Sequence, residues 1–189
     1  MITTLIATIA MGYVAPADAL NCPVMGSPVP ANAKGVDYAG VRYLMCCAGC
    51  DATFAKDTGK YTKAKEGMTI GQSLFDPVSG VRVDVKKAKG PMDYKGVRYY
   101  FSSDDNASAF KADMAKFTKA PEKEVLYCPV MKHGIENYDT AGSYTDFEGV
   151  RYYLCCGDCQ AQMKKDPASF AKGVADKVAK PSVRTYKVK

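Results

Sequence analysis

The feature that most constrains this chain is that it repeats itself three times. The motif Asp-aromatic-x-Gly-Val-Arg-Tyr occurs at 37–43, 93–99 and 146–152. A second motif precedes each copy: Cys-Pro-Val-Met at 22–25, Asp-Pro-Val-Ser at 76–79 and Cys-Pro-Val-Met at 128–131. Matches at a nearly constant offset indicate tandem copies of one unit. Units this small seldom bury enough core to fold alone, so they usually carry a metal, disulfides or a partner.

Each copy has the same predicted order of elements. A turn with Pro comes first, followed by a β-hairpin whose second strand is the Gly-Val-Arg-Tyr segment. A tight loop then leads into a short helix, with apolar residues such as Phe54 and Tyr61 at helical spacing. One Asp in each copy is expected to cap or stop a helix: Asp57, Asp113 and Asp166.

The first residues have the pattern of a secretory signal. An apolar stretch carries no charge before Asp18 and ends in Ala17-Asp18-Ala19, a suitable cleavage site. It is too short to span a bilayer, which needs about 20 apolar residues. We therefore predict a signal peptide at 1–19 and an exported protein, periplasmic or secreted, without stable membrane insertion. The copies follow at 20–67, 70–121 and 124–175, and a tail at 176–189 closes the chain.

The eight cysteines fall in two groups of four, one in the first copy and one in the third. Cys22 and Met25 precede the hairpin of the first copy, and Cys46, Cys47 and Cys50 follow it; Cys128, Met131, Cys155, Cys156 and Cys159 take these places in the third. Two segments that each supply sulfur can converge on one metal, as in a treble-clef site. The fold we predict is α+β, three tandem small treble-clef-like repeats, each a β-hairpin plus a short helix.

Two details of the ligand set stay open at this point. Cys47 and Cys156 should point away from the site if their neighbours bind, because side chains alternate on extended backbone; they are then buried nearby or serve as substitute ligands. Met25 and Met131 favour copper(I), since a thioether is a poor zinc ligand, but Met also fills cores readily. His133, the only histidine, is a further ligand candidate.

The middle copy provides an internal control. At the four candidate places it carries oxygen or amide groups instead of sulfur: Asp76, Ser79, Ser102 and Asn106. A soft metal has no reason to bind there. We therefore expect two soft metal ions per chain, copper(I) or zinc, and a middle copy that is stable only against its neighbours.

These motifs resemble the YHS domain and the related TRASH-like metal-binding domains. The likeness rests on the Asp/Cys-Pro-Val opening, on Tyr-x-Gly-x-x-Tyr and on Cys-x-x-x-Cys followed by Phe, and it covers nearly all of the chain after the signal. In the family's opening a cysteine stands where this chain has Met25, Ser79 and Met131. The resemblance implies a module for copper or other heavy metals, in metal handling or sensing, and no reaction.

Other interpretations compete with metal binding. The cysteines could form disulfides, although the adjacent pairs make pairing awkward. Cys47-Ala48-Gly49-Cys50 and Cys156-Gly157-Asp158-Cys159 are C-x-x-C motifs, but no thioredoxin-like pattern surrounds them. In a third interpretation the metal or disulfides only hold together an interaction or scaffold module.

Composition argues against two further classes of function. The net charge of +6 comes from Lys and Arg scattered among acids, whereas a nucleic-acid groove would concentrate them. One histidine leaves little general acid–base machinery, and no Ser/His/Asp set or P-loop is present. We expect a non-enzymatic protein whose partners are the metal ion and, as a candidate, another metal-handling protein.

Overall fold

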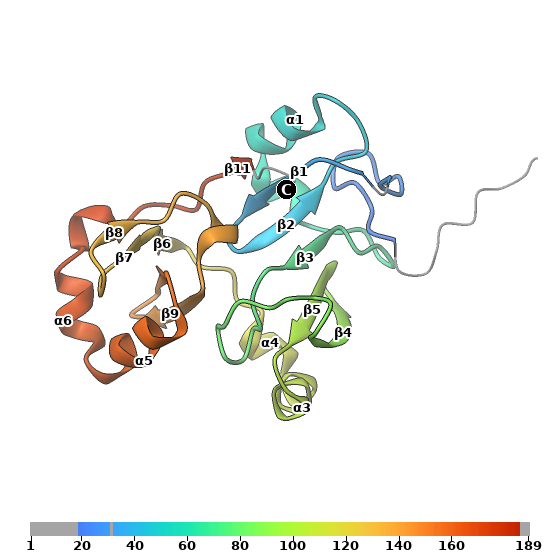
Figure 1. Cartoon of the computed structure of the whole chain (residues 1–189). Coiled ribbons are helices and arrows are strands. Elements are labelled where there is room, and N and C mark those ends of the chain that lie inside the picture. Colours follow the sequence, from blue (N-terminus) through green and yellow to red (C-terminus); the bar gives the residue numbers. More distant parts are fainter. Residues whose placement is uncertain (1–18, 31, 186–189) are drawn as a thin grey trace, which may run out of the picture.

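The computed structural model describes residues 19–30 and 32–185 (Figure 1). Within this range the chain mixes short helices with small sheets, which confirms the predicted α+β class. The predicted signal peptide, apart from Ala19, and the last residues of the predicted tail, 186–189, lie outside the described residues. We call the ranges 20–67, 70–121 and 124–175 the first, second and third segments.

Each segment contains a hairpin at the predicted place. The strand pairs are β1 (Gly35–Tyr38) with β2 (Val41–Leu44), β4 (Lys89–Tyr94) with β5 (Val97–Phe101), and β9 (Ser143–Phe147) with β10 (Val150–Leu154). Both residues of each two-residue turn have positive φ, at Ala39-Gly40, Lys95-Gly96 and Glu148-Gly149. This is the type I′ turn that matches the twist of paired strands, and glycine at its second place avoids the strain of a side chain.

An ion pair between the strands recurs in each hairpin. The Arg after each turn donates two hydrogen bonds of 2.8–2.9 Å to an Asp carboxylate on the opposite strand. The pairs are Asp37 with Arg42, Asp93 with Arg98, and Asp146 with Arg151. Bidentate pairing fixes geometry as well as charge, which accounts for the spacing of Asp and Arg in the repeated motif.

Two short helices follow each hairpin. They are α1 (Cys50–Lys56) and α2 (Thr58–Tyr61), α3 (Asp104–Ala112) and α4 (Met114–Phe117), and α5 (Gly157–Lys165) and α6 (Pro167–Lys172). The Asp between the helices ends the first and caps the second, accepting a backbone N–H at 3.0–3.1 Å. The capping roles predicted for Asp57, Asp113 and Asp166 are therefore confirmed.

The sheets do not follow the boundaries of the segments. A six-stranded sheet has the order β11-β1-β2-β3-β5-β4, so it joins the strands of the first two segments and adds one strand from the tail. Its β3 (Gly71–Ser73) joins β2 to β5, and β11 (Arg184–Thr185) brings the end of the described chain onto β1. The third segment has a sheet of its own, β6-β10-β9, in which β6 (Lys123–Val125) runs parallel to β10. The strands β7 (Tyr127–Cys128) and β8 (His133–Gly134) form a separate pair.

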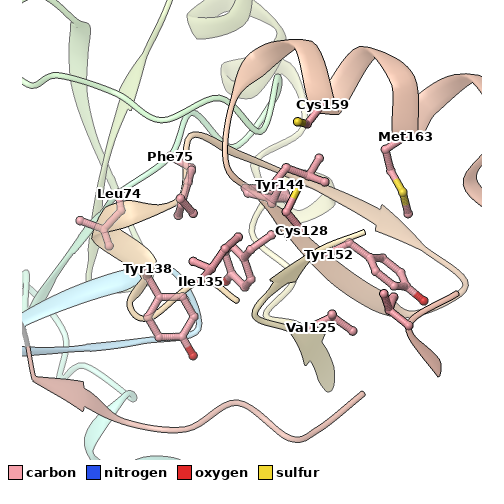
Figure 2. Packing of buried hydrophobic residues seen from close by; sticks show 14 residues of the cluster. Leu74, Phe75, Val125, Cys128, Ile135, Tyr138, Tyr144, Tyr152, Cys159 and Met163 are labelled. Atoms are coloured by element: carbon pink, nitrogen blue, oxygen red, sulfur yellow. The ribbon is translucent and has the colours of Figure 1, made fainter. Parts of the chain in front are cut away.

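Three apolar clusters form the core, and the largest lies in the third segment. It includes Tyr138, Tyr153 and Met163, which are fully buried, and it also takes in Leu74 and Phe75 from the second segment (Figure 2). One helix residue per segment is completely buried under its hairpin: Phe54, Phe110 and Met163. Burying each such side chain stabilises the fold by about 1.5–3 kcal/mol.

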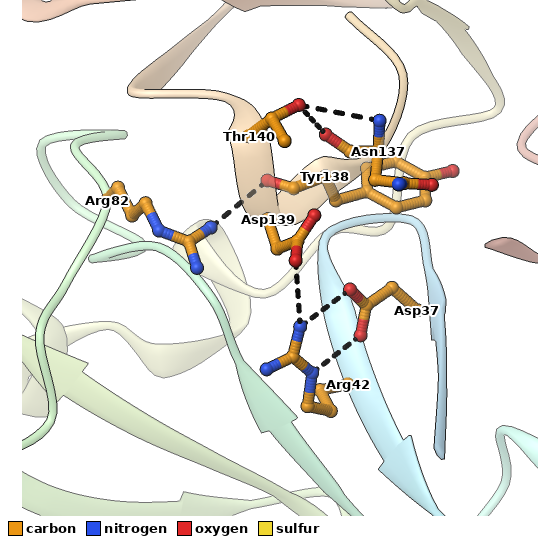
Figure 3. A network of polar contacts seen from close by, with 7 residues as sticks. All are labelled: Asp37, Arg42, Arg82, Asn137, Tyr138, Asp139 and Thr140. Carbon is orange, nitrogen blue, oxygen red and sulfur yellow. Dashed lines mark hydrogen bonds and ion pairs between the residues drawn. The ribbon is translucent and has the colours of Figure 1, made fainter. Parts of the chain in front are cut away.

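Polar contacts join all three segments where the hairpin of the first meets the third. Arg42, paired with buried Asp37, also lies 3.9 Å from the carboxylate of Asp139, in the 3-10 helix η1 (Tyr138–Thr140) (Figure 3). Arg82 of the second segment donates to the carbonyl of Tyr138 at 3.1 Å. A second 3-10 helix, η2 (Ala175–Lys177), precedes the return of the chain to β11. In residues 19–30 and 32–185 no helix has the length and hydropathy to cross a membrane.

Candidate metal centres

The first residue of the Cys/Asp-Pro-Val motif is held in the same way in each segment. Its carbonyl accepts a hydrogen bond of 2.7–2.8 Å from the N–H four residues later, where the backbone is left-handed: Gly26, Gly80 and Lys132. A short β-bridge closes the loop, pairing Asn21 with Pro28, Phe75 with Arg82, and Tyr127 with Gly134. We call this loop the knuckle. Its first side chain is completely buried in all three cases: Cys22, Asp76 and Cys128.

In the first segment the knuckle meets the start of α1. The Sγ atoms of Cys22, Cys46 and Cys50 lie within 4.8 Å of one another. Cys46 follows β2 and Cys50 begins α1, so two regions distant in sequence supply the sulfurs. All three are free thiols.

The third segment builds a second cluster from the equivalent residues, Cys128, Cys155 and Cys159. The Sγ of Cys155 lies 3.6 Å from that of Cys128 and 3.5 Å from that of Cys159. Figure 2 places Cys128 and Cys159 among the buried residues of the large core cluster. Soft sulfur donors at this spacing suit a soft or borderline cation such as copper(I) or zinc.

The prediction that Cys47 and Cys156 point away from these clusters is wrong. Their Sγ atoms lie 2.8 Å from Cys50 Sγ and 2.9 Å from Cys159 Sγ. The physical reason is clear for Cys156, which is the N-cap of α5, because an N-cap side chain turns back toward the residue three positions later. Each cluster therefore has a fourth sulfur at its edge.

Other residues proposed from the sequence lie at the surface. Met25 and Met131 are 63% and 61% exposed, so neither serves as core filler. His133 is exposed, and its Nδ1 lies 3.0 Å from the carbonyl of Gly134. The grouping of His, Cys, Asp and Glu side chains within the described residues does not bring His133 to either cluster.

The knuckle thiols favour ionisation. Burial raises the pKa of Cys22, but N–H groups of Cys46, Met25 and Val24 donate to its sulfur, and the net effect is a lowered pKa. Cys128 has a lowered pKa for the same reasons, burial being outweighed by N–H groups of Cys155, Met131 and Val130. Each cluster therefore has one buried thiol that the backbone prepares to become a thiolate.

The other two thiols of each triad have raised pKa values, which favours their protonated form. Cys156 differs, because the contact with Cys159 lowers its pKa. Burial, with the neighbouring sulfurs of Cys22 and Cys47, raises the pKa of Cys46 to about 11. The contact with Cys47, followed by burial, raises the pKa of Cys50, and burial is the main cause of the raised pKa values of Cys155 and Cys159. A bound cation would displace these protons, because the thiolate is the form that binds metal.

The second segment has a carboxylate in the same setting. Asp76 Oδ2 accepts hydrogen bonds from the Ser102 N–H at 2.8 Å, the Ser102 hydroxyl at 2.6 Å and the Asn106 side chain at 2.6 Å. Its Oδ1 accepts the N–H groups of Val78 and Ser79. Burial raises the pKa of Asp76, yet these bonds outweigh it and leave the pKa lowered. Donors stabilise the knuckle anion here, so no cation is needed.

Comparison with known proteins identifies no relative of this chain. No family model matches the chain, and neither a curated protein nor a solved structure matches it. The functional assignment therefore depends on the chemistry of the two cysteine clusters.

Proposed function

We propose that this chain is an exported, non-enzymatic protein that binds two soft metal ions, copper(I) or zinc, and acts in metal handling or sensing. The observation that carries the proposal is the pair of cysteine clusters, each with three free thiols within 4.8 Å. Both are assembled in one way, from a knuckle and the start of a helix. An export signal at 1–19 and a periplasmic or secreted location belong to the same proposal.

The proposal includes the architecture that the sequence repeats imply. The three segments are copies of one treble-clef-like unit similar to the YHS and TRASH-like domains, and the middle copy has exchanged its metal site for hydrogen bonds. Recurrence of the type I′ turn, the Asp–Arg pair, the knuckle bond and the capping Asp supports this. Duplication of one unit accounts for all these features more simply than their independent origin in three places.

Copper(I) and zinc use the sulfurs differently. Copper(I) is satisfied by three thiolates, for which Cys22, Cys46 and Cys50 suffice in the first cluster. Zinc is usually four-coordinate in structural sites, so it would recruit Cys47 as well. The same distinction applies to Cys156 in the third segment. At either metal these residues supply negative charge and soft donors, and the backbone donors at the knuckle hold the first sulfur in place.

Metal stoichiometry tests the proposal directly. Protein purified under reducing conditions and loaded with copper(I) should hold two ions per chain by elemental analysis. Replacing Cys46 and Cys50 by Ser should remove one ion, as should replacing Cys155 and Cys159. Replacing Ser102 and Asn106 by Ala, the matched control, should remove none. Three ions, or none with all thiols free, would contradict the assignment.

A second candidate function is favoured by one observation, the close approach within each C-x-x-C pair. Sγ atoms 2.8 and 2.9 Å apart make Cys47–Cys50 and Cys156–Cys159 the pairs that oxidation would join. The protein would then be a thiol redox protein or a disulfide-stapled scaffold. Mass spectrometry of the protein as isolated from an oxidising compartment distinguishes metal binding from disulfide formation. Disulfides at both pairs, without bound metal, would favour this alternative.

A further inference from the structure

The two clusters differ in the loop that leads into the helix. The sequence is Cys46-Cys47-Ala48-Gly49-Cys50 in the first segment and Cys155-Cys156-Gly157-Asp158-Cys159 in the third. In the third, α5 already begins at 157, and the N–H of Cys159 donates to the Cys156 sulfur at 3.3 Å. The loop is therefore taken into the first turn of the helix.

In the first segment the helix begins two residues later in the motif. Gly49 is left-handed, with φ of 86°, and α1 starts only at Cys50 without a side-chain cap. Asp105 and Asp158 occupy the equivalent place in the other segments, within the first turn of α3 and α5. A glycine here allows the loop to stay outside the helix, and Cys47 is left without its capping bond.

As a consequence, the second cysteine of the loop is more accessible to solvent in the first segment than in the third. Cys47 is exposed, whereas Cys156 is half-buried. A groove of about 880 Å³ runs beside the first cluster and is lined by Cys46 and Cys47 together with Pro30, Ala33, Met45 and Asp51. This volume falls within the range of sites for small molecules, roughly 300–1,000 Å³. The knuckle and helix thiols are buried in core clusters in both segments, Cys22 and Cys50 in the first and Cys128 and Cys159 in the third (Figure 2). The difference in access therefore concerns Cys47 and Cys156.

We propose that the two sites have different roles: the first exchanges its metal with a low-molecular-weight thiol that enters the groove, and the second keeps its metal as part of the fold. This inference rests on the proposed metal binding. Cys47 is the exchange residue, because its sulfur reaches both the groove and Cys50. The occupant is a thiol because only a soft donor competes with thiolates for a soft cation.

The exchange is a ligand substitution. The Cys47 thiol loses its proton and binds the metal as the bond from Cys50 to the metal breaks. Each entering thiol then loses its proton and forms a metal–sulfur bond in place of one protein thiolate, Cys47 first and then Cys22 and Cys46. Each protein thiolate that leaves the metal takes up one proton. No electron is transferred, so neither an oxidant nor a reductant is required.

Transfer kinetics test the proposal on the full chain loaded with two copper(I) ions. Reduced glutathione is the attacking thiol, and bathocuproine disulfonate reports the copper(I) released. Two phases of equal amplitude are expected, and only the fast phase should accelerate with glutathione concentration. The variant with Cys46 and Cys50 replaced by Ser should lack the fast phase. Cys47→Ser should slow that phase on the order of tenfold, whereas Cys156→Ser, the matched control, should leave it unchanged.

Exchanging the two loops provides a second test that keeps every cysteine. Ala48→Gly with Gly49→Asp gives the first segment the loop of the third, and Gly157→Ala with Asp158→Gly does the reverse. Neither glycine has an atom within 4 Å of an added Cβ, so both exchanges have room. Asp is strained at the left-handed φ of Gly49, and this strain favours the helical loop of the third segment. The first exchange should slow the fast phase, and the second should make the slow phase dependent on glutathione.

Failure of this inference and failure of metal binding give different results. If two ions bind but leave at one rate, or if Cys47→Ser and Cys156→Ser act alike, only the division of roles is overturned. Loop exchanges that leave both rates unchanged overturn it too. If no metal binds at all, the proposed function fails before any kinetics are measured.

Discussion

The knuckle of the second segment and those of the first and third segments stabilise a buried acidic group by different means. Each places a buried acidic group at the same point, a carboxylate at Asp76 and thiols with lowered pKa at Cys22 and Cys128. Around Asp76 a hydroxyl, an amide and three backbone N–H groups donate hydrogen bonds. Around Cys22 and Cys128, the residues equivalent to Ser102 and Asn106 are cysteines. Their thiolates would repel a thiolate at the knuckle.

This difference shows that a metal would contribute positive charge where hydrogen-bond donors are lacking. An anion surrounded by donors is stable by itself, whereas three thiolates within 4.8 Å need a cation between them. The knuckle backbone makes the same hydrogen bond in both cases, so the side chains around it decide whether the site depends on metal.

The largest effect should come from restoring sulfur to the second segment. The triple variant Asp76→Cys, Ser102→Cys, Asn106→Cys should bind a third copper(I) ion, because the knuckle and α3 already place these residues together. Elemental analysis under reducing conditions measures the change from two ions to three. Asp76→Cys alone should add none, and a triple variant that is folded yet holds two ions would show that the backbones are not equivalent.

The pH dependence of metal affinity should be steep. The pKa values of Cys46 and Cys50 are raised, so both carry protons at neutral pH and both must lose them when metal binds. Affinity should therefore rise by at least about 100-fold per pH unit between pH 6 and 8, corresponding to at least two protons released per ion. Competition with a chelator of known affinity measures this slope, and a slope near zero would mean that the thiolates already exist without metal.

Asp76→Asn should destabilise the metal-free protein by about 2–3 kcal/mol, because it removes the charge from several hydrogen bonds. The folded pKa of Asp76 is lowered, so its contribution is complete above the unfolded pKa, about 3.9, and is lost as the pH falls through the folded pKa. Urea unfolding at pH 7 and at pH 3 measures both effects. Asp105→Asn, at an exposed position in the first turn of α3, is the control and should change neither.

The smallest effect should come from the methionines. Met25→Leu and Met131→Leu should weaken copper(I) binding by less than about tenfold and leave zinc binding and fold unchanged, since thiolates supply the main donors. Their exposure, 63% and 61%, already argues against a packing role. A loss of a whole ion in either variant would instead make the thioether an essential ligand, and no change at all would leave thiolates as the sole donors.

Local structure could be predicted from the sequence because each feature depends on residues close together. The Asp-aromatic-x-Gly motif predicts a hairpin, since the glycine suits the left-handed second place of its turn. The motif spacing also brought out the two cysteine triads and the loss of sulfur from the second segment. Asp57, Asp113 and Asp166 were found as caps by the same local logic.

Contacts between segments could not be predicted in this way. Nothing local to Gly71–Ser73 indicates that it lies between β2 and β5, antiparallel to one and parallel to the other. The docking of the second knuckle on the third segment depends on Gln160, whose side chain donates to the carbonyls of Ser79 and Tyr144. Strand alternation does not predict the positions of Cys47 and Cys156, because both lie in the loop that leads from a strand into a helix.

The pairing of β11 with β1 changes what kind of assembly the three segments make. In an open row of similar units, the two outer units have only one neighbour each and fray first. Here the first segment contacts the second through β2 and β3, the second contacts the third through the bridge of Val81 with Ser143, and the chain after the third returns to the first at β1. The row is thus closed into a ring of three, in which no unit is terminal and each is flanked by both of the others.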